Sequence, residues 1–273
     1  MEIAITHIST ACVLLEIGSV RILTDPIFDT GEITYSAAPG VPFTRFQGPT
    51  IKPADRWKLE KLDAILLSHP HHADNLDKGG QALLKNASEV ITATEEVGFL
   101  SGHATGLKAW SQTTIIGPPP DRLKITVTAT PALHGKPWIP NQHLEFDARH
   151  VRGFILEWPG QEHGALWISG DTVRFPELRK VGEKKIGTAL LHLGAARFWF
   201  PPGVRYTFDA AEVVWMAEEL GHSLKTLIPI HYEQSVWSHF KQDVSTYVRA
   251  FRKAGLSDRV KWLEKGERTS VIV

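Results

Sequence analysis

The chain has 273 residues, with 30 basic and 30 acidic side chains and a formal net charge of zero. A balanced charge excludes a global electrostatic attraction to nucleic acid or to an anionic membrane, and no segment approaches the roughly 20 apolar residues needed to cross a bilayer. The N-terminus lacks a basic and apolar leader, and the single cysteine, Cys12, cannot form an internal disulfide. We therefore expect a cytoplasmic protein that acts on a small molecule, binds neither nucleic acid nor membrane, and is able to form a homo-oligomer.

The first third of the chain begins with strand-like segments and then loses its pattern. Apolar runs at 2–8, 12–18 and 20–25, separated by small residues and glycine, predict a meander of strands. From Thr30 to Arg56 the sequence becomes rich in proline and glycine and shows no period. Such a stretch predicts a long loop that is a lid, a binding loop or partly disordered, and its aromatic residues favour a lid. A role as an interface is also open.

The remainder of the chain alternates between strands and helices. Apolar runs predict strands at 63–68, 89–94, 123–131, 152–159, 165–171, 188–194 and 225–231, and helical patterns predict helices at 75–87, 95–102, 208–222 and 239–255. This alternation is typical of an α/β protein. Because no repeat, low-complexity tract or break in composition marks a linker, we expect a single domain over residues 1–273.

Four of the predicted strands end in, or are soon followed by, a histidine or an aspartate. These residues are His69, His134, Asp171 and His231, and His69 lies in the stretch AILLSHPHHADNLD, which holds three of the chain's thirteen histidines. Strand ends that meet at one edge of a sheet are a common place for a site in α/β proteins. Imidazole nitrogen and carboxylate oxygen suit zinc, manganese or iron, so the pattern predicts a metal centre.

The ordered set of motifs resembles the metallo-β-lactamase fold superfamily, and within it the branch of the L-ascorbate phosphate lactonase. The resemblance rests on THISTACVLLEIGSVRILTDPIFD, the histidine cluster, PALHG, SGDT and IPIHYEQSVWSHF. It implies an α/β (α+β) fold, a four-layer αβ/βα sandwich in which two mixed sheets pack face to face with helices outside. It also implies one or two divalent metal ions, with zinc or manganese ahead of iron.

The histidine cluster departs from the superfamily's H-x-H-x-D-H motif, and two registers are open. Read without a gap from His69, the motif takes His71 as its second histidine but leaves no carboxylate at the aspartate position. One inserted residue places His72 and Asp74 in the motif and puts Asn75 where the last histidine belongs. We favour the insertion, because it keeps His72 and Asp74 two residues apart. His71 would then face solvent or touch the substrate.

In that register the resemblance assigns each motif residue a role. His69, His72 and His134 would hold one metal, Asp74 and His231 would hold a second, and Asp171 would bridge the two. Asp74 and Asp171 are the expected catalytic carboxylates: a metal pair lowers the pKa of a shared water, and Asp74 would orient that water or pass its proton to the leaving group. An amide is a weaker, neutral ligand, so Asn75 would weaken the second position or leave a single metal.

Three residues near the predicted strand ends have both a structural and a functional interpretation. Asp25, in LTDP, has two equally favoured interpretations. It is a turn residue that caps a strand end before proline, or, as the resemblance implies, it forms a hydrogen bond with a ligand histidine. His7 and His192 could orient a ligand or the bridging water, but we favour packing in the core.

Aromatic residues and an arginine predict a substrate pocket. The segment AARFWFPPGVRYTFD brings Arg197, Trp199 and Tyr206 together, which suits a substrate with an apolar body and an anionic group. An equally favoured alternative is that these side chains only pack the loop against the sheets and contact no substrate. Trp237 and His239, in VWSHF, border the pocket or only begin the last helix.

The function expected from these features is a metal-dependent hydrolase. It would use a metal-activated water on a small ester, lactone, amide or phosphate-containing metabolite. The alternative is a metal-binding or regulatory member of the fold with weak or no turnover, which Asn75 motivates. A redox di-iron or RNA-processing member ranks last, because the sequence has neither an acidic residue replacing a motif histidine nor an inserted nuclease domain or basic face.

Overall fold

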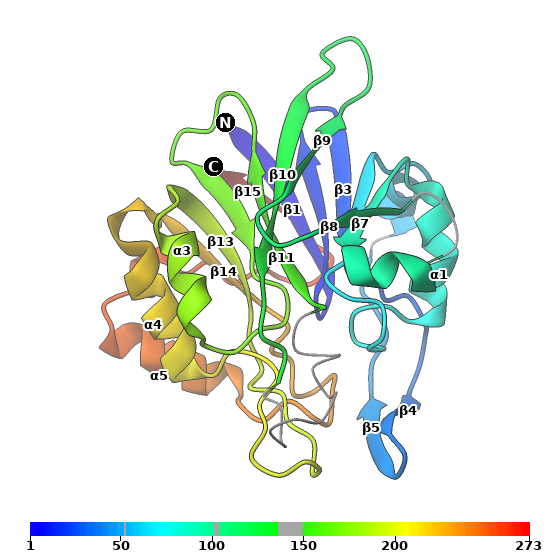
Figure 1. Ribbon diagram of the computed structural model, residues 1–273, viewed down its shortest axis with the longest axis vertical. Helices are drawn as coiled ribbons and strands as arrows, with labels where there is room; N and C mark the ends of the chain where they lie inside the picture. Colours follow the sequence, from blue (N-terminus) through cyan, green and yellow to red (C-terminus); the bar gives the residue numbers. More distant parts are fainter. Residues whose placement is uncertain (52, 101–103, 136–149) are drawn as a thin grey trace.

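Two β-sheets form the centre of the protein in the computed structural model, which describes residues 1–51, 53–100, 104–135 and 150–273 (Figure 1). Within these residues one sheet has seven strands in the order β15-β1-β2-β3-β6-β7-β8. Its strands are β1 (Glu2–Ser9), β2 (Cys12–Ile17), β3 (Val20–Thr24), β6 (Ala64–Leu66), β7 (Val90–Ala93), β8 (Ala104–Leu107) and β15 (Arg268–Ile272). The first four strands of the order pair antiparallel and the last four pair parallel, so the sheet is mixed.

The second sheet has six strands in the order β14-β13-β12-β11-β10-β9 within the same described ranges. They are β9 (Gln112–Ile116), β10 (Lys124–Pro131), β11 (Arg152–Glu157), β12 (Ala165–Ile168), β13 (Ile186–His192) and β14 (Thr226–Ile230). Strands β9 to β12 pair antiparallel, whereas β12, β13 and β14 pair parallel. The predicted helices correspond to α1 (Lys78–Leu83), η3 (Thr94–Phe99), α4 (Ala210–Leu220) and α5 (Val244–Lys253), and a short α3 (Arg179–Gly182) precedes β13.

The apolar side chains divide into three clusters that define the layers. One cluster joins the facing surfaces of the two sheets and includes Val13 and Leu66 from the first and Val127 and Ile228 from the second. A second cluster packs α3, α4 and α5 on the outer face of the second sheet, and a third lies over the outer face of the first sheet beside α1 (Figure 1). Helices outside and sheets inside confirm the predicted αβ/βα sandwich. No helix within the described residues is long and apolar enough to cross a membrane.

The prediction of an unpatterned loop from Thr30 to Arg56 was wrong. Strands β4 (Ile33–Ala38) and β5 (Val41–Arg45) pair there as an antiparallel hairpin, which extends at the lower edge of Figure 1, and a 3-10 helix, η1 (Pro53–Leu59), follows. Buried and exposed residues alternate along β5, as in a strand with one covered face. The proline within β5 and the alanines of β4 hid this alternation in the sequence, and Gly40, with φ +76°, makes the turn between the strands.

Candidate metal centre

The predicted ligands meet where strands from both sheets end. His69 follows β6, His134 follows β10, Asp171 follows β12 and His231 follows β14. Potential ligand atoms of His69, His134 and Asp171 all lie within 4.8 Å of one another, and so do those of Asp74, Asp171 and His231. Asp171 therefore belongs to two adjacent groups, which is the arrangement expected of a bridging carboxylate.

The first group is completed by His72. His72 Nδ1 lies 2.9 Å from His134 Nε2 and 3.2 Å from His69 Nε2. His69 Nε2 lies 3.9 Å from Asp171 Oδ2. His71 instead points its Nδ1 at Glu96 Oε2, 3.7 Å away, and its side chain is 21% exposed. This geometry favours the register that uses His72.

The second group is built around two carboxylate oxygens. His231 Nε2 lies 3.4 Å from Asp74 Oδ2 and 3.5 Å from Asp171 Oδ2. Metal–ligand bonds of about 2.1 Å separate neighbouring ligands of one ion by about 3.0–3.4 Å, so these spacings suit a shared cation. Within the described part of the chain, Asp171 Oδ2 and His231 Nε2 are buried and have no hydrogen-bond partner. Because buried polar atoms are rarely left unsatisfied, the donor set fits a divalent metal ion.

The protonation states favour metal binding. Burial and the neighbouring His71, His134 and His72 hold the pKa of His69 well below its ordinary value, so its imidazole is neutral at pH 7. Burial opposes ionisation of Asp171, but the charge of His231 and the hydrogen bond from His192 outweigh it and lower the pKa of Asp171 to about 2.

His231 behaves differently from the other ligand histidines. Burial would lower the pKa of His231, but the charges of Asp171 and Asp74 outweigh it and raise that pKa to about 9. A proton on His231 therefore neutralises part of the carboxylate charge. A divalent cation would take the place of that proton between the same two carboxylates.

The second ring nitrogen is also held in three of the four predicted ligand histidines. The Tyr206 carbonyl oxygen accepts a hydrogen bond from His134 Nδ1 at 2.9 Å, and the Leu193 carbonyl oxygen accepts one from His231 Nδ1 at 3.3 Å. His69 Nδ1 lies 2.8 Å from Ser68 Oγ. Such partners set the tautomer and orientation of ligand imidazoles.

Ser68 is in turn held by the two residues whose roles were open in the sequence. Asp25 Oδ1 accepts a hydrogen bond of 2.7 Å from the Ser68 amide, so Asp25 supports the ligand loop and not a histidine directly. Asn75 Nδ2 donates to Ser68 Oγ at 3.3 Å. Asn75 therefore reaches His69 through Ser68.

Replacing Ser68 with alanine is expected to weaken metal binding by about 10- to 100-fold, the usual cost of losing a partner that orients a ligand. Competition with a chromophoric chelator measures the affinity. Ser245→Ala, at an exposed serine far from the ligands, serves as the matched control and should leave the affinity unchanged. Equal affinities for the two variants would contradict a supporting role for Ser68.

Two histidines that were not among the predicted ligands contact them. His192 is fully buried, and its Nδ1 lies 2.8 Å from Asp171 Oδ1, so it packs in the interior and also contacts a predicted ligand. His239 Nε2 lies 3.0 Å from Asp74 Oδ2. His7, by contrast, bonds the Thr10 carbonyl oxygen at 3.0 Å, and its Nε2 lies 3.7 Å from Glu233 Oε1. The position of His192 at the end of β13 was the available signal, because four predicted ligands also follow strand ends.

The four expected pocket residues separate into two pairs. The Tyr206 ring lies 5.2 Å from the His134 ring, and Trp237 is fully buried with its ring 5.5 Å from that of His239. Arg197 and Trp199 are exposed on the loop after β13. Tyr206 and Trp237 thus pack against the histidines, and Arg197 and Trp199 are free to meet a ligand from solvent.

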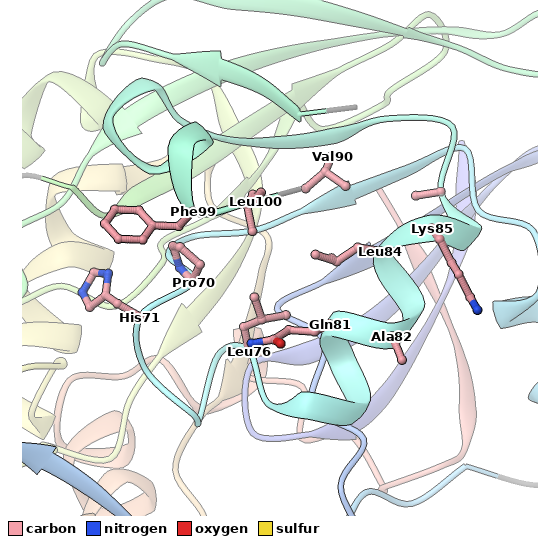
Figure 2. Close-up of a pocket in the computed structure, with 11 residues that line it drawn as sticks. Pro70, His71, Leu76, Gln81, Ala82, Leu84, Lys85, Val90, Phe99 and Leu100 are labelled. Atoms are coloured by element: carbon pink, nitrogen blue, oxygen red, sulfur yellow. The ribbon is translucent and has the colours of Figure 1, made fainter. Parts of the chain in front are cut away.

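A cavity of about 700 Å³ lies beside the ligand loop, between α1 and η3 (Figure 2). His71 and Pro70 form its end nearest the histidines, and Leu76, Gln81 and Phe99 contribute further walls. His71 is also a neighbour of the predicted ligand His69, since the two rings lie 4.9 Å apart. Of the described residues, neither the predicted metal ligands nor the four expected pocket residues line it.

Comparisons with known proteins agree with this fold. The family model described as "Beta-lactamase superfamily domain" matches residues 20–232. A curated metal-dependent hydrolase of Deinococcus radiodurans is 26% identical over 215 residues, which cover 76% of this chain and 80% of the relative. An isothiocyanate hydrolase from Delia radicum gut bacteria has a TM-score of 0.76 at 16% identity, with 97% of this chain and 98% of that chain covered. A possible metal-dependent hydrolase from Veillonella parvula has a TM-score of 0.77 at 14% identity, with 99% of both chains covered.

At such low identities the structural likenesses establish the fold alone. The family model is more informative, because the residues it matches span well over half of the chain and include every predicted ligand. The protein therefore belongs to the beta-lactamase superfamily.

Proposed function

We propose that the protein hydrolyses a small ester, lactone, amide or phosphate-containing metabolite with a metal-activated water. The observation that carries the proposal is the position of Asp171 Oδ2, buried and without a hydrogen-bond partner in the described ranges, 3.5 Å from His231 Nε2 and 3.9 Å from His69 Nε2. Asp171 Oδ2 lies between the two groups of predicted ligands, so it is placed as a carboxylate oxygen that is shared by two cations would be. The chain is a metal-dependent hydrolase of its superfamily. What we propose here is the class of its substrate.

The residues divide the work as follows. His69, His72 and His134 would hold one cation, Asp74 and His231 would hold the other, and Asp171 would be shared between them. When bound, divalent ions supply a water of lowered pKa and polarise the oxygen of the scissile group. His231 and His239 outweigh the effect of burial and keep the pKa of Asp74 well below its ordinary value, so this carboxylate stays ionised and orients the attacking water.

Several finer features belong to the same proposal. The likeness of the motifs to the L-ascorbate phosphate lactonase branch favours a lactone, and the exposed Arg197 and Trp199 suit an anionic substrate with an apolar part. Zinc or manganese is favoured over iron for a site of imidazole and carboxylate. We further propose one domain over residues 1–273, a cytoplasmic location, and a small-molecule substrate with no nucleic-acid or membrane partner, with a homo-oligomer as an option.

Metal removal tests the proposed function directly. Protein purified without added metal is expected to carry close to two equivalents, and to hydrolyse at least one member of a panel of lactones, esters, amides and phosphodiesters. Chelation should abolish turnover and lower the melting temperature, because an ion bound to the folded state stabilises it, and added zinc or manganese should restore both. Metal bound without any turnover would favour the binding or regulatory alternative, and no metal after supplementation would refute the proposal.

A further inference from the structure

We propose that His239 is a ligand of the second metal and replaces the histidine that the motif lacks at Asn75. The inference rests on the proposed function, because it concerns the same metal pair. It concerns a residue that neither the motif nor the two groups of predicted ligands includes.

His239 contacts one member of the second group, Asp74. Its Nε2 lies 3.0 Å from Asp74 Oδ2, and His231 Nε2 lies 3.4 Å from the same oxygen. Two imidazoles thus turn the same ring atom toward one carboxylate oxygen. These separations match the roughly 3.0–3.4 Å between neighbouring ligands of one ion with bonds of about 2.1 Å. With His239, each metal position has four protein ligands, Asp171 being shared.

The surroundings of His239 leave its ring little freedom to turn elsewhere. The side chain is buried, and within the described residues four aromatic rings pack on it. They are Phe43 at 4.9 Å, Phe198 at 5.2 Å, Trp237 at 5.5 Å and Phe240 at 4.6 Å between ring centroids. Packing of this kind fixes a rotamer before the ligand arrives, which lowers the entropic cost of binding a metal.

The backbone around His239 is tied to two other parts of the site. The His239 carbonyl oxygen accepts a hydrogen bond of 2.9 Å from the Arg197 amide, and the Thr44 carbonyl oxygen accepts one of 3.0 Å from the Ser238 amide. Ser238 Oγ in turn accepts a bond of 2.8 Å from the Thr44 amide. The β4–β5 hairpin therefore holds His239 at its place beside Asp74.

Asn75 is engaged on the other side of the site. Its Nδ2 donates to Ser68 Oγ, which lies against His69, a ligand of the first metal. An amide is also a weaker ligand than imidazole for zinc or manganese. The sequence position of the missing histidine is thus used to orient His69, and the imidazole comes from a different part of the chain.

Zinc titration against a chromophoric chelator tests the assignment, with the bound metal also counted by mass spectrometry. The variants are His239→Ala, His239→Gln and Asn75→Ala, and His222→Ala, at an exposed histidine outside the site, is the control. Glutamine can keep an N–H donor near Asp74 but has no imidazole. Wild type and His222→Ala should bind two ions with equal affinities. Asn75→Ala should keep the second ion, and only its first affinity should fall, because Asn75 supports His69 through Ser68. Both His239 variants should bind one tightly and lose the second affinity by more than about 100-fold, beyond the effect of a supporting partner.

Each other result overturns the assignment. A second ion held by His239→Gln within tenfold of wild type would make His239 only a hydrogen-bond partner of Asp74. Loss of the second ion from Asn75→Ala, with its retention in His239→Ala, would make Asn75 the ligand. Two ions in wild type and in both His239 variants would overturn this inference and leave the proposed function standing, whereas no ion in wild type would overturn both. Circular dichroism of the metal-free variants checks that each variant folds. If His239→Ala does not fold, the more conservative His239→Gln alone tests the assignment.

Discussion

Asp171→Ala is expected to lower kcat by about a thousandfold or more and to remove metal from both positions. Asp171 is the residue common to the two groups of ligands, and its second oxygen is held by His192 at 2.8 Å. Metal ions are worth several kcal/mol of transition-state stabilisation, and about 4 kcal/mol corresponds to a thousandfold change in rate. Steady-state kinetics and metal analysis on the same preparations measure the two losses together.

The matched control is Asp258→Ala, at an exposed aspartate in a 3-10 helix far from the ligands. It should keep both ions and full activity. Asp171→Asn adds a second comparison, since it keeps an oxygen for His192 but removes the negative charge that two cations share. An Asp171→Ala enzyme with two ions and normal turnover would rule out the bridging role.

Asp77→Ala is expected to lower the free energy of unfolding by about 3–5 kcal/mol, the usual cost of leaving a buried charge without its partner. Asp77 Oδ2 lies 2.8 Å from Arg45 Nη1, and both side chains are fully buried. The same carboxylate accepts the amides of Phe28, Asp29 and Gly80, the last of which caps α1. Urea unfolding followed by tryptophan fluorescence gives the free energy.

Asp243→Ala isolates the contribution of helix capping in this comparison. Asp243 caps α5 through the Thr246 amide but is exposed and has no buried partner, so its replacement should lower the free energy of unfolding by much less than the replacement of Asp77. An Asp77→Ala loss no larger than that of Asp243→Ala would mean that the ion pair with Arg45 contributes nothing to stability. The pair matters to the site because it ties β5, which holds His239 in place, to the segment that carries Asp74.

Local pattern was sufficient for most strands of the two main sheets and for several of the predicted ligands. Apolar runs in the sequence predicted β6, β12 and β14. The structure brings together the residues that follow these strands, which are His69, Asp171 and His231. A strand is predictable from its own residues because side-chain alternation and β-branched composition act locally. Parallel strands then bring their ends to one edge whatever the loops do, so the place of the site follows from the order of the elements.

Only the tertiary structure decided the remaining parts of the site. His239 and Asp74 are 165 residues apart, and nothing near either of them in the sequence encodes their contact at 3.0 Å. That contact depends on the β4–β5 hairpin, whose alternation was hidden by proline and alanine, and on the packing of Phe43 against the His239 ring. His192 likewise became a partner of Asp171 only when β12 and β13 paired in parallel. Residue type and spacing determine which groups can bind a metal, but packing between distant segments determines which of them reach it.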